Sequence, residues 1–223
     1  MDEEYALEIY RRLKTVFNYE LKRKITSIRR DRDPFRLLIA TILSQNTNDR
    51  NSSRAFERLR REVGIEPLKL ANADIRKIEE AIKIGGLYRV KAKVIKKLAK
   101  TVLKTYRGDL SKLLTGSLDE ARSKLMSLPG VGAKTADIVL LFAKDLPTLP
   151  VDTHVNRVSK RLGLAPFNAD YEEVRRNLMD KYPQSLYLEV HLLFILLGRT
   201  YCKSRNPSCL HCPLRDICPS AKL

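Results

Sequence analysis

Apolar residues recur every three or four positions along most of the chain, which is the spacing of one face of an α-helix. The segment 74–84, DIRKIEEAIKI, carries isoleucines at this spacing, and the segment 48–63 carries Phe, Leu and Val in the same way. Strictly alternating apolar and polar positions, which are typical of strands, do not occur in the sequence. We therefore predict an all-α fold with short loops.

Capping residues predict where several of these helices begin and end. Asp33 and Pro34 form a cap and first-turn pair before FRLLIATILS, while Asn48 and Asp74 are placed to cap the next helices. A capping box is predicted where Glu120 follows Ser117 by three residues, in a helix that ends near residue 128. Three glycines are placed to stop helices: Gly108, Gly163 and Gly198.

The charge of the chain is strongly unbalanced. Lys and Arg number 43 against 26 Asp and Glu, which gives a net charge of +17. Such an excess favours a polyanionic partner, and nucleic acid is the first candidate, although a solvated Lys/Arg-rich surface is the alternative. No apolar run approaches the roughly 20 residues of a membrane span, and the opening MDEEYALEIYRR does not resemble a signal peptide. We therefore expect an intracellular protein that is not inserted in a membrane.

All four cysteines lie in the segment 202–218, CKSRNPSCLHCPLRDIC, at Cys202, Cys209, Cys212 and Cys218, with gaps of six, two and five residues. Such a cluster favours one metal centre over disulfides, which belong to oxidising compartments. The spacing suits zinc and a [4Fe–4S] cluster about equally. Four thiolates complete the coordination, so His211 is expected to be an exposed loop residue. The loop would present Lys203, Arg205 and Arg215 to a phosphate backbone.

A glycine turn precedes a helix in LPGVGAK, residues 128–134. Gly130 and Gly132 allow unusual backbone angles and close approach, and the N–H groups of a helix start can hold a phosphate. A simple packing corner is the alternative, but it needs one glycine rather than two. The segment IGGLYRVKAK, residues 84–93, has a similar turn with Gly86 and a later lysine, Lys91.

Lys134 and Asp152 are the candidate catalytic residues. We expect partial burial of Lys134 and the helix dipole to lower the pKa of this amine from its ordinary value near 10.4, which would make it a nucleophile. Contact with a phosphate through the ammonium group is the alternative role. Asp152 lies in LPVDTHVNR, where an N-cap is its simplest role, and His154 is expected to be structural.

Together, LPGVGAKTA, VDTHVNR, PFRLLIATILSQNTND, GGLYRVKAK and the four-cysteine segment resemble the endonuclease III family of helix-hairpin-helix DNA glycosylases. The resemblance covers essentially the whole chain. It implies a six-helix barrel at 35–146, with the helix-hairpin-helix motif at about 117–144. It also implies a discontinuous second domain, 1–34 with 147–223, which carries a [4Fe–4S] cluster on loop 202–218, and an active site in the cleft between the two domains.

Matching positions imply the individual roles. Lys134 matches the family's nucleophile and Asp152 its essential carboxylate, while Ser44 and Asp49 match its lesion pocket. Either Gln45 or Asn46 would fill the gap left by the extruded base. Further DNA contacts are expected from Gly86, Lys91, Gly130, Gly132, Arg157, Lys203 and Arg205. Met126 departs from the pattern, because a Glu is common there, and this could alter lesion choice.

The resemblance therefore implies a bifunctional DNA glycosylase and AP lyase of base excision repair. It would excise oxidised or damaged pyrimidines through a lysine Schiff base and cut the strand 3′ to the abasic site. Its partner would be double-stranded DNA with damaged bases or abasic sites. It would act as a monomer in the cytoplasm or nucleoid, with an AP endonuclease and a polymerase following it.

Three alternatives remain at this point. One is a mismatch-specific thymine, uracil or adenine glycosylase of the same superfamily, against which Lys134 argues. The second is a non-catalytic DNA-binding module, and the third is a zinc-stapled RNA-binding protein.

Overall fold

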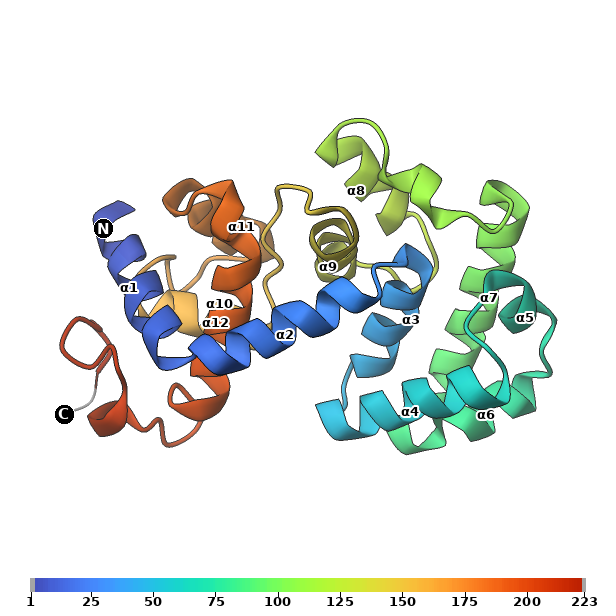
Figure 1. Ribbon diagram of the computed structural model, residues 1–223, viewed down its shortest axis with the longest axis horizontal. Helices are drawn as coiled ribbons and strands as arrows, with labels where there is room; N and C mark the ends of the chain where they lie inside the picture. Colours follow the sequence, from blue (N-terminus) through green and yellow to red (C-terminus); the bar gives the residue numbers. More distant parts are fainter. Residues whose placement is uncertain (1–2, 222–223) are drawn as a thin grey trace. The chain divides into compact units, whose positions relative to one another are not determined.

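The structure is a computed structural model that describes residues 3–221, and it is built from helices joined by turns (Figure 1). No strand occurs within this described range. The predicted all-α fold is therefore confirmed. Among the described residues, no helix combines the length and apolar character that crossing a membrane requires.

The chain divides into two compact units, with boundaries after Arg30 and after Leu146. From the sequence, the first boundary was expected after residue 34 and the second after residue 146. We call residues 31–146 the middle unit, and the described residues before and after it the terminal unit.

The middle unit contains seven α-helices and two short 3-10 helices within its described residues. They are α3 (Pro34–Ser44), α4 (Asp49–Glu62), α5 (Pro67–Asn72), α6 (Ile75–Ile82), η1 (Lys83–Gly85), α7 (Tyr88–Tyr106), η2 (Leu110–Leu114), α8 (Leu118–Met126) and α9 (Ala133–Lys144). Their apolar faces enclose one core, whose fully buried members include Leu38 and Ile39 of α3, Ile95 of α7 and Val139 of α9. This core holds the loops at the ends of α3 and α8 in place.

The terminal unit combines the two ends of the chain. Its described elements are α1 (Glu3–Val16), α2 (Asn18–Arg30), α10 (Thr153–Arg161), α11 (Tyr171–Lys181), η3 (Gln184–Leu186), α12 (Tyr187–Thr200) and η4 (Cys209–His211). Most of α12 is buried, including Phe194 at 1% exposure, and α1, α2 and α10 pack against this helix. α12 is therefore the centre of this unit.

The predicted helix starts are confirmed by side-chain caps. The carboxylates of Asp33 and Asp74 and the amide oxygen of Asn48 each accept a backbone N–H from the first turn of α3, α6 and α4, respectively. Ser117 and Glu120 form the predicted capping box at the start of α8. Each cap satisfies a backbone donor that helix geometry leaves unpaired, so these starts are encoded locally.

Two of the three predicted glycine stops are confirmed, and one is wrong. Gly108 and Gly163 follow α7 and α10 with φ of +82° and +69°, a region that favours glycine. Gly198 instead lies inside α12. A Cβ at Gly198 would lie 2.9 Å from both Cβ and Nδ1 of His154, so this glycine allows α10 to pack closely on α12.

Candidate active site

The glycine turn between α8 and α9 uses its two glycines differently. Gly130 has φ of +77°, and a Cβ there would collide with Cγ1 of Val94 on α7. Gly130 is therefore required by the turn and by packing. The hairpin is fixed further by a buried ion pair, in which Arg122 of α8 donates from Nε (2.9 Å) and Nη2 (3.1 Å) to the carboxylate of Asp137 in α9.

Gly132 has neither of these reasons to be glycine. It is the N-cap of α9, its φ of −96° is open to any residue, and a Cβ added there would have no other atom within 4 Å. No side chain of the described residues caps the first turn of α9. The N–H groups at this helix start are therefore open to an anion, and the missing side chain lets that anion come close.

Lys134 lies in this first turn, two residues after Gly132. Its side chain is exposed, so the expected partial burial is wrong. The buried side chains of α9 include Thr135, Ala136, Val139 and Leu140, and Lys134 is not among them. The amine is thus accessible to a large partner beside the open helix start.

Four predicted DNA or pocket residues lie in the loop that joins α3 to α4 or at the helix ends beside it. Ser44, Gln45, Asn46 and Asp49 are all exposed. Asn46 has φ of +53°, in the left-handed region, and Ser44 Oγ donates to the Thr41 carbonyl at 2.8 Å. The loop is accessible and has a defined shape.

Lys91 is not available as a DNA contact, which corrects that prediction. It is 4% exposed, and its Nζ donates to the Leu43 carbonyl at 2.9 Å and to the Gly85 carbonyl at 3.1 Å. Burial lowers the pKa of this amine. Lys91 therefore joins the α3–α4 loop to the Gly85–Gly86 turn from inside the unit.

We expect Lys91→Met to lower the free energy of unfolding by about 1 to 3 kcal/mol, because two buried carbonyls lose their donor. Since no phosphate contact is removed, the slope of log K against log salt for duplex binding should not change, whereas loss of a phosphate contact would reduce it by about 0.9. Chemical denaturation and a salt titration of DNA affinity measure the two quantities. If Lys91→Met instead reduced the slope of log K against log salt and left the free energy of unfolding unchanged, Lys91 would be a DNA contact after all.

The apolar residues at the Gly86 turn were not predicted from the sequence. Gly86 is exposed with φ of +68°, and the next residue, Leu87, has φ of +51° and 56% exposure. Ile84 and Val90 are also exposed, at 40% and 62%. One feature of the sequence could have indicated them: Leu87, a large apolar residue, directly follows two glycines in a turn. Most large apolar side chains elsewhere in the unit are buried, so an apolar residue in an exposed turn is unusual.

Asp152 begins α10 in the terminal unit as its N-cap, as its simplest interpretation predicted. Its Oδ1 accepts the Val155 N–H at 2.7 Å, and its Oδ2 accepts no hydrogen bond from the described residues. The preceding segment is anchored, because the buried His191 ring bonds the Pro150 carbonyl at 2.8 Å. Asp152 also lines a surface hollow of about 360 Å³.

Arg157 is directed into the terminal unit rather than toward a partner, which corrects its predicted role in DNA binding. Its Nε donates to the Cys202 carbonyl at 2.9 Å, and its Nη2 lies 3.0 Å from the Gly198 carbonyl and 3.1 Å from His154 Nδ1. Burial lowers the pKa of His154, consistent with a neutral ring that accepts from Arg157. These bonds connect the helix that begins with Asp152 to the cysteine segment.

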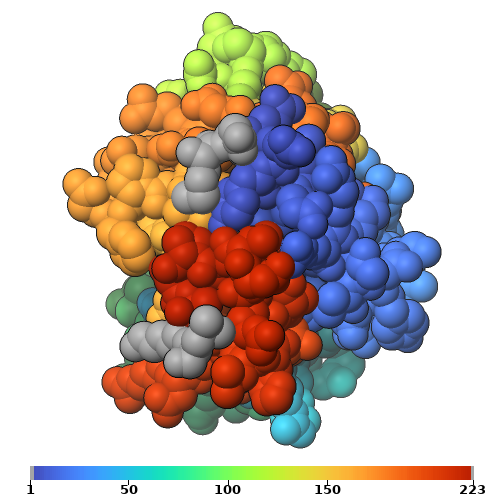
Figure 2. Space-filling view, turned by 90° about the vertical axis from the view of Figure 1, so that its left-hand side faces the viewer, coloured from blue at the N-terminus to red at the C-terminus, as the bar shows by residue number. Residues whose placement is uncertain are grey.

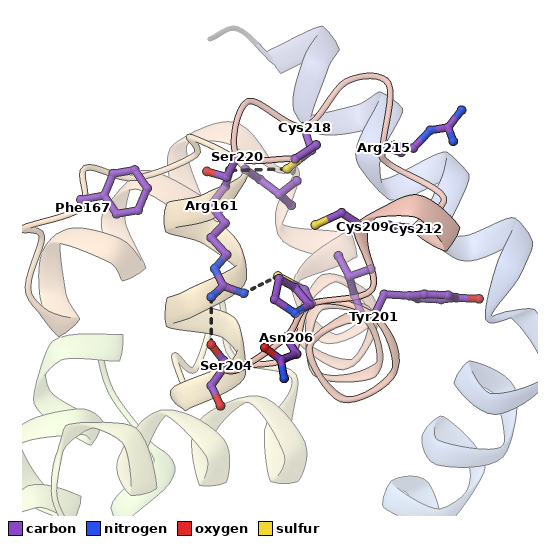
Figure 3. Close-up of a pocket in the computed structure, with 15 residues that line it drawn as sticks. Arg161, Phe167, Tyr201, Ser204, Asn206, Cys209, Cys212, Arg215, Cys218 and Ser220 are labelled. Carbon is purple, nitrogen blue, oxygen red and sulfur yellow. Dashed lines mark hydrogen bonds between the residues drawn. The ribbon is translucent and has the colours of Figure 1, made fainter. Parts of the chain in front are cut away.

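The four cysteines are brought together, because Cys202, Cys209, Cys212 and Cys218 line one cavity of about 500 Å³ (Figure 3). All four are free thiols of intermediate burial. Burial raises the pKa of Cys212 and Cys218, so a cation would be needed to keep their thiolates. Lys203, Arg205 and His211 are exposed beside the cavity, and His211 is not part of its lining.

Within residues 3–221, no group of three or more His, Cys, Asp or Glu is placed to hold a metal ion. The structure gathers the four thiols around one cavity without showing a metal centre there.

The N-terminal helix, in dark blue, lies against the C-terminal segment, in red, at the surface (Figure 2), and hydrogen bonds hold the cysteine segment in place. The Tyr5 hydroxyl of α1 is shared between the carbonyls of Leu162 (3.1 Å) and Ile217 (3.0 Å), and Arg12 donates to the Asp216 carboxylate at 2.7 and 2.8 Å. Arg161 donates from Nη2 to the Ser204 carbonyl at 3.2 Å (Figure 3). It also donates from Nη1 to the Lys203 carbonyl at 2.7 Å, and its Nη1 lies 3.5 Å from Cys202 Sγ. The cavity is therefore supported by α1 and α10.

Residues 39–184 match the HhH-GPD superfamily of base excision DNA repair proteins. This match covers more than half of the chain and includes the hairpin, Lys134 and Asp152. The fold and the two candidate residues thus fall within one class of DNA repair protein.

Full-length relatives narrow the class. The chain is 35% identical to endonuclease III of Sulfolobus acidocaldarius, over 96% of this chain and 95% of that protein, and 37% identical to endonuclease III of Thermotoga maritima, over 89% of each. A solved structure of a trapped covalent intermediate between endonuclease III and DNA matches 99% of this chain and 97% of that one, at 32% identity and a TM-score of 0.84. The chain belongs to the endonuclease III family.

Proposed function

We propose that the protein removes oxidised or otherwise damaged pyrimidines from duplex DNA, with Lys134 as the nucleophile and Asp152 as the assisting carboxylate. The enzyme class follows from the family: the chain is a DNA glycosylase and AP lyase of base excision repair. The observation that carries the proposal is the placement of Lys134. It is an exposed amine in the first turn of a helix whose start is open to a phosphate.

DNA would be held first through its backbone. A phosphate would accept hydrogen bonds from the N–H groups at the start of α9, beside Gly132, and the exposed Lys203 and Arg205 would contact the same duplex. Because Lys134 is exposed in the free protein, the enclosure that favours a neutral amine has to come from the bound DNA.

Base extrusion would use the two loops that Lys91 joins. A damaged or mispaired base costs less to unstack, which supplies part of the selectivity. Gln45 or Asn46 would fill the vacancy, and the exposed Leu87 would wedge into the stack as apolar side chains do in bent duplexes. Ser44 and Asp49 would contact the extruded base.

Lys134 Nζ would attack C1′ of the extruded nucleotide, and the bond from C1′ to the base would break, with the base leaving after it gains a proton. Asp152 Oδ2, the oxygen that the cap does not use, would stabilise positive charge on the sugar and accept a proton from the amine. The C1′–O4′ bond of this adduct would then break, with O4′ taking a proton, to give the Schiff base. Loss of a C2′ proton from the Schiff base would break the C3′–O bond and release the strand on the 3′ side with its terminal phosphate. The solved relative forms a trapped covalent intermediate with DNA, which is the chemistry such a lysine would perform.

We also propose that Cys202, Cys209, Cys212 and Cys218 bind one [4Fe–4S] cluster. The cluster would hold the loop that carries Lys203 and Arg205, and no chemical step above uses it. The proposal is supported by the cavity that the four cysteines share and by their spacing, which resembles that of the endonuclease III family.

Protein purified without oxygen should therefore contain about four iron atoms per chain and absorb visible light. Cys212→Ser should lose most of this iron and unfold at a lower temperature, while His211→Ala should retain it, since His211 does not line the cavity. Metal analysis and visible spectra measure the outcome. A colourless protein with one zinc ion per chain would contradict the cluster.

A panel of defined duplexes tests the substrate proposal. Oxidised thymine, oxidised cytosine, uracil, an abasic site and G·T and A·oxidised-guanine mispairs would be compared, with base release scored separately from strand scission. We expect damaged pyrimidines to be released and their strands cut. Release confined to mispaired normal bases would favour the mismatch glycosylase instead.

The protein is expected to act alone on its duplex, as a monomer. Its cleaved product carries a sugar fragment on the 3′ end, so an enzyme that trims this end and a polymerase have to follow.

A further inference from the structure

A row of cations runs along one exposed face of α7, outside the residues assigned above. We call it the α7 cation row, and it consists of Arg89, Lys93, Lys97, Lys100, Lys104 and Arg107. Successive members are three or four positions apart, so at about 100° per residue the five within the helix, from Arg89 to Lys104, fall within an arc of about 80°. Arg107 follows them as the left-handed C-cap. All six are exposed. The opposite face of α7, which includes Ile95, Leu98 and Val102, is buried against α3, α5 and α6 (Figure 1).

No carboxylate neutralises these six cations. The 19 residues of α7 contain no Asp or Glu, and none of the six forms an ion pair with any described residue. On α4, in contrast, Arg58 pairs with Glu62 at 2.9 Å and Arg60 pairs with Glu57 at 2.8 Å. The row therefore gathers six cations on one side of the chain without the charge pairing that these arginines of α4 have.

An unpaired row of like charges destabilises an isolated helix. Each such pair at a spacing of three or four residues costs a few tenths of a kcal/mol, whereas a Glu–Lys pair at the same spacing stabilises the helix. A helix face that contacts only solvent would be more stable if cations and anions alternated along it. A row without carboxylates is instead suited to a partner that supplies the negative charge, and a phosphate backbone offers one charge about every 3.4 Å along a strand.

The row extends well beyond the loops assigned to the lesion. Lys91 ties the start of α7 to the end of α3, so the lesion loops lie at the N-terminal end of α7. From Arg89 to Lys104 the helix rises by about 23 Å, a length that spans about seven phosphates of one strand. The far half of the row, from Lys97 onward, is thus distant from the Gly86 turn.

We propose that the α7 cation row is a second DNA-binding surface, which holds a second duplex while the lesion loops hold the first. Binding there would be independent of sequence and sensitive to salt, because it uses exposed cations and no groove-reading residues. It would keep the enzyme attached to DNA during transfer from one segment to another. The inference rests on the proposed function only in taking DNA as the polyanion.

The test uses the full protein, an abasic duplex little longer than one helical turn, and an undamaged duplex of the same length. At low salt, analytical ultracentrifugation should find two short duplexes bound per wild-type chain. The triple variant Lys97→Gln, Lys100→Gln, Lys104→Gln should bind one, and its salt slope for undamaged DNA should fall by about 2 to 3. Gln favours helices nearly as well as Lys, so α7 should stay folded.

The matched control removes three cations that have carboxylate partners: Arg58→Gln, Arg60→Gln, Arg61→Gln on α4. It has the same net charge as the triple variant and should still bind two duplexes. Strand cleavage of the short abasic duplex should stay at the wild-type rate in both, which separates this inference from the role of Lys134.

A one-to-one complex for the wild-type protein would overturn the proposal, and so would a two-to-one complex that the α7 variant retains. Displacement of the second duplex by a Glu-rich polypeptide but not by polymeric phosphate would also overturn it, because the row would then be a protein-binding surface.

Discussion

Lys134→Gln should abolish strand cleavage while leaving the duplex bound. Removing a covalent nucleophile is expected to lower the rate by about a thousandfold or more. DNA affinity should change only by the loss of one cation, which alters the salt slope by about 0.9 at most. Cleavage of an abasic duplex and fluorescence anisotropy of the same duplex measure the two effects.

Lys134→Arg is the matched variant for the alternative role of this residue. Arginine keeps the positive charge and binds phosphate well, but its guanidinium stays protonated and does not attack C1′. If Lys134 only contacted a phosphate, Lys134→Arg would remain active. Nicking by a nuclease-free preparation of either variant would refute Lys134 as the nucleophile.

Asp152→Asn should slow base release by about a hundredfold to ten-thousandfold, because the carboxylate that stabilises the developing positive charge is lost. The fold should be unaffected. Asn caps a helix about as well as Asp, so the bond to the Val155 N–H is kept and the free energy of unfolding should stay the same. Single-turnover release of a damaged base and thermal unfolding measure the two quantities.

Two further variants separate catalysis from capping. Asp152→Ala should lose both activity and about 1 kcal/mol of stability. Asp74→Asn makes the same exchange at the N-cap of α6 and should change neither. If Asp152→Asn released the damaged base at the wild-type rate, Asp152 would act only as the helix cap and not in catalysis.

Local signals in the sequence predicted the helix starts well. Asp33, Asn48, Asp74 and Ser117 each bond to N–H groups two or three residues away, so the outcome depends on little besides neighbouring residues. Gly198 was misplaced for the opposite reason. Its role depends on His154, which lies on another helix far away in the sequence.

The surroundings of the lysines were predicted least well. Lys91 and Lys134 both lie in the first turns of helices that follow glycines, yet Lys91 is buried and Lys134 is exposed. The difference is set by the carbonyls of Leu43 and Gly85, which only the folded middle unit brings to Lys91. A helical position alone does not determine such an environment.

The arrangement of the cysteine segment was predicted in part from the sequence. The gaps between the cysteines indicated one common site, and the structure places all four around one cavity. They could not distinguish zinc from a cluster, because this choice depends on how far apart the fold holds the sulfur atoms. The position of the segment also depends on long-range contacts, which Tyr5 makes to the Ile217 carbonyl and Arg161 to the Lys203 carbonyl.

Reduction of the Schiff base tests the central claim most directly. Wild-type protein would be mixed with duplexes that contain oxidised thymine or an abasic site, borohydride would be added, and covalent adducts would be separated on a denaturing gel. We predict a protein–DNA adduct whose cross-linked peptide contains Lys134, formed by the wild-type chain and absent from Lys134→Gln. The absence of an adduct from active wild-type protein, or an adduct through another residue, would contradict the role of Lys134 as the nucleophile.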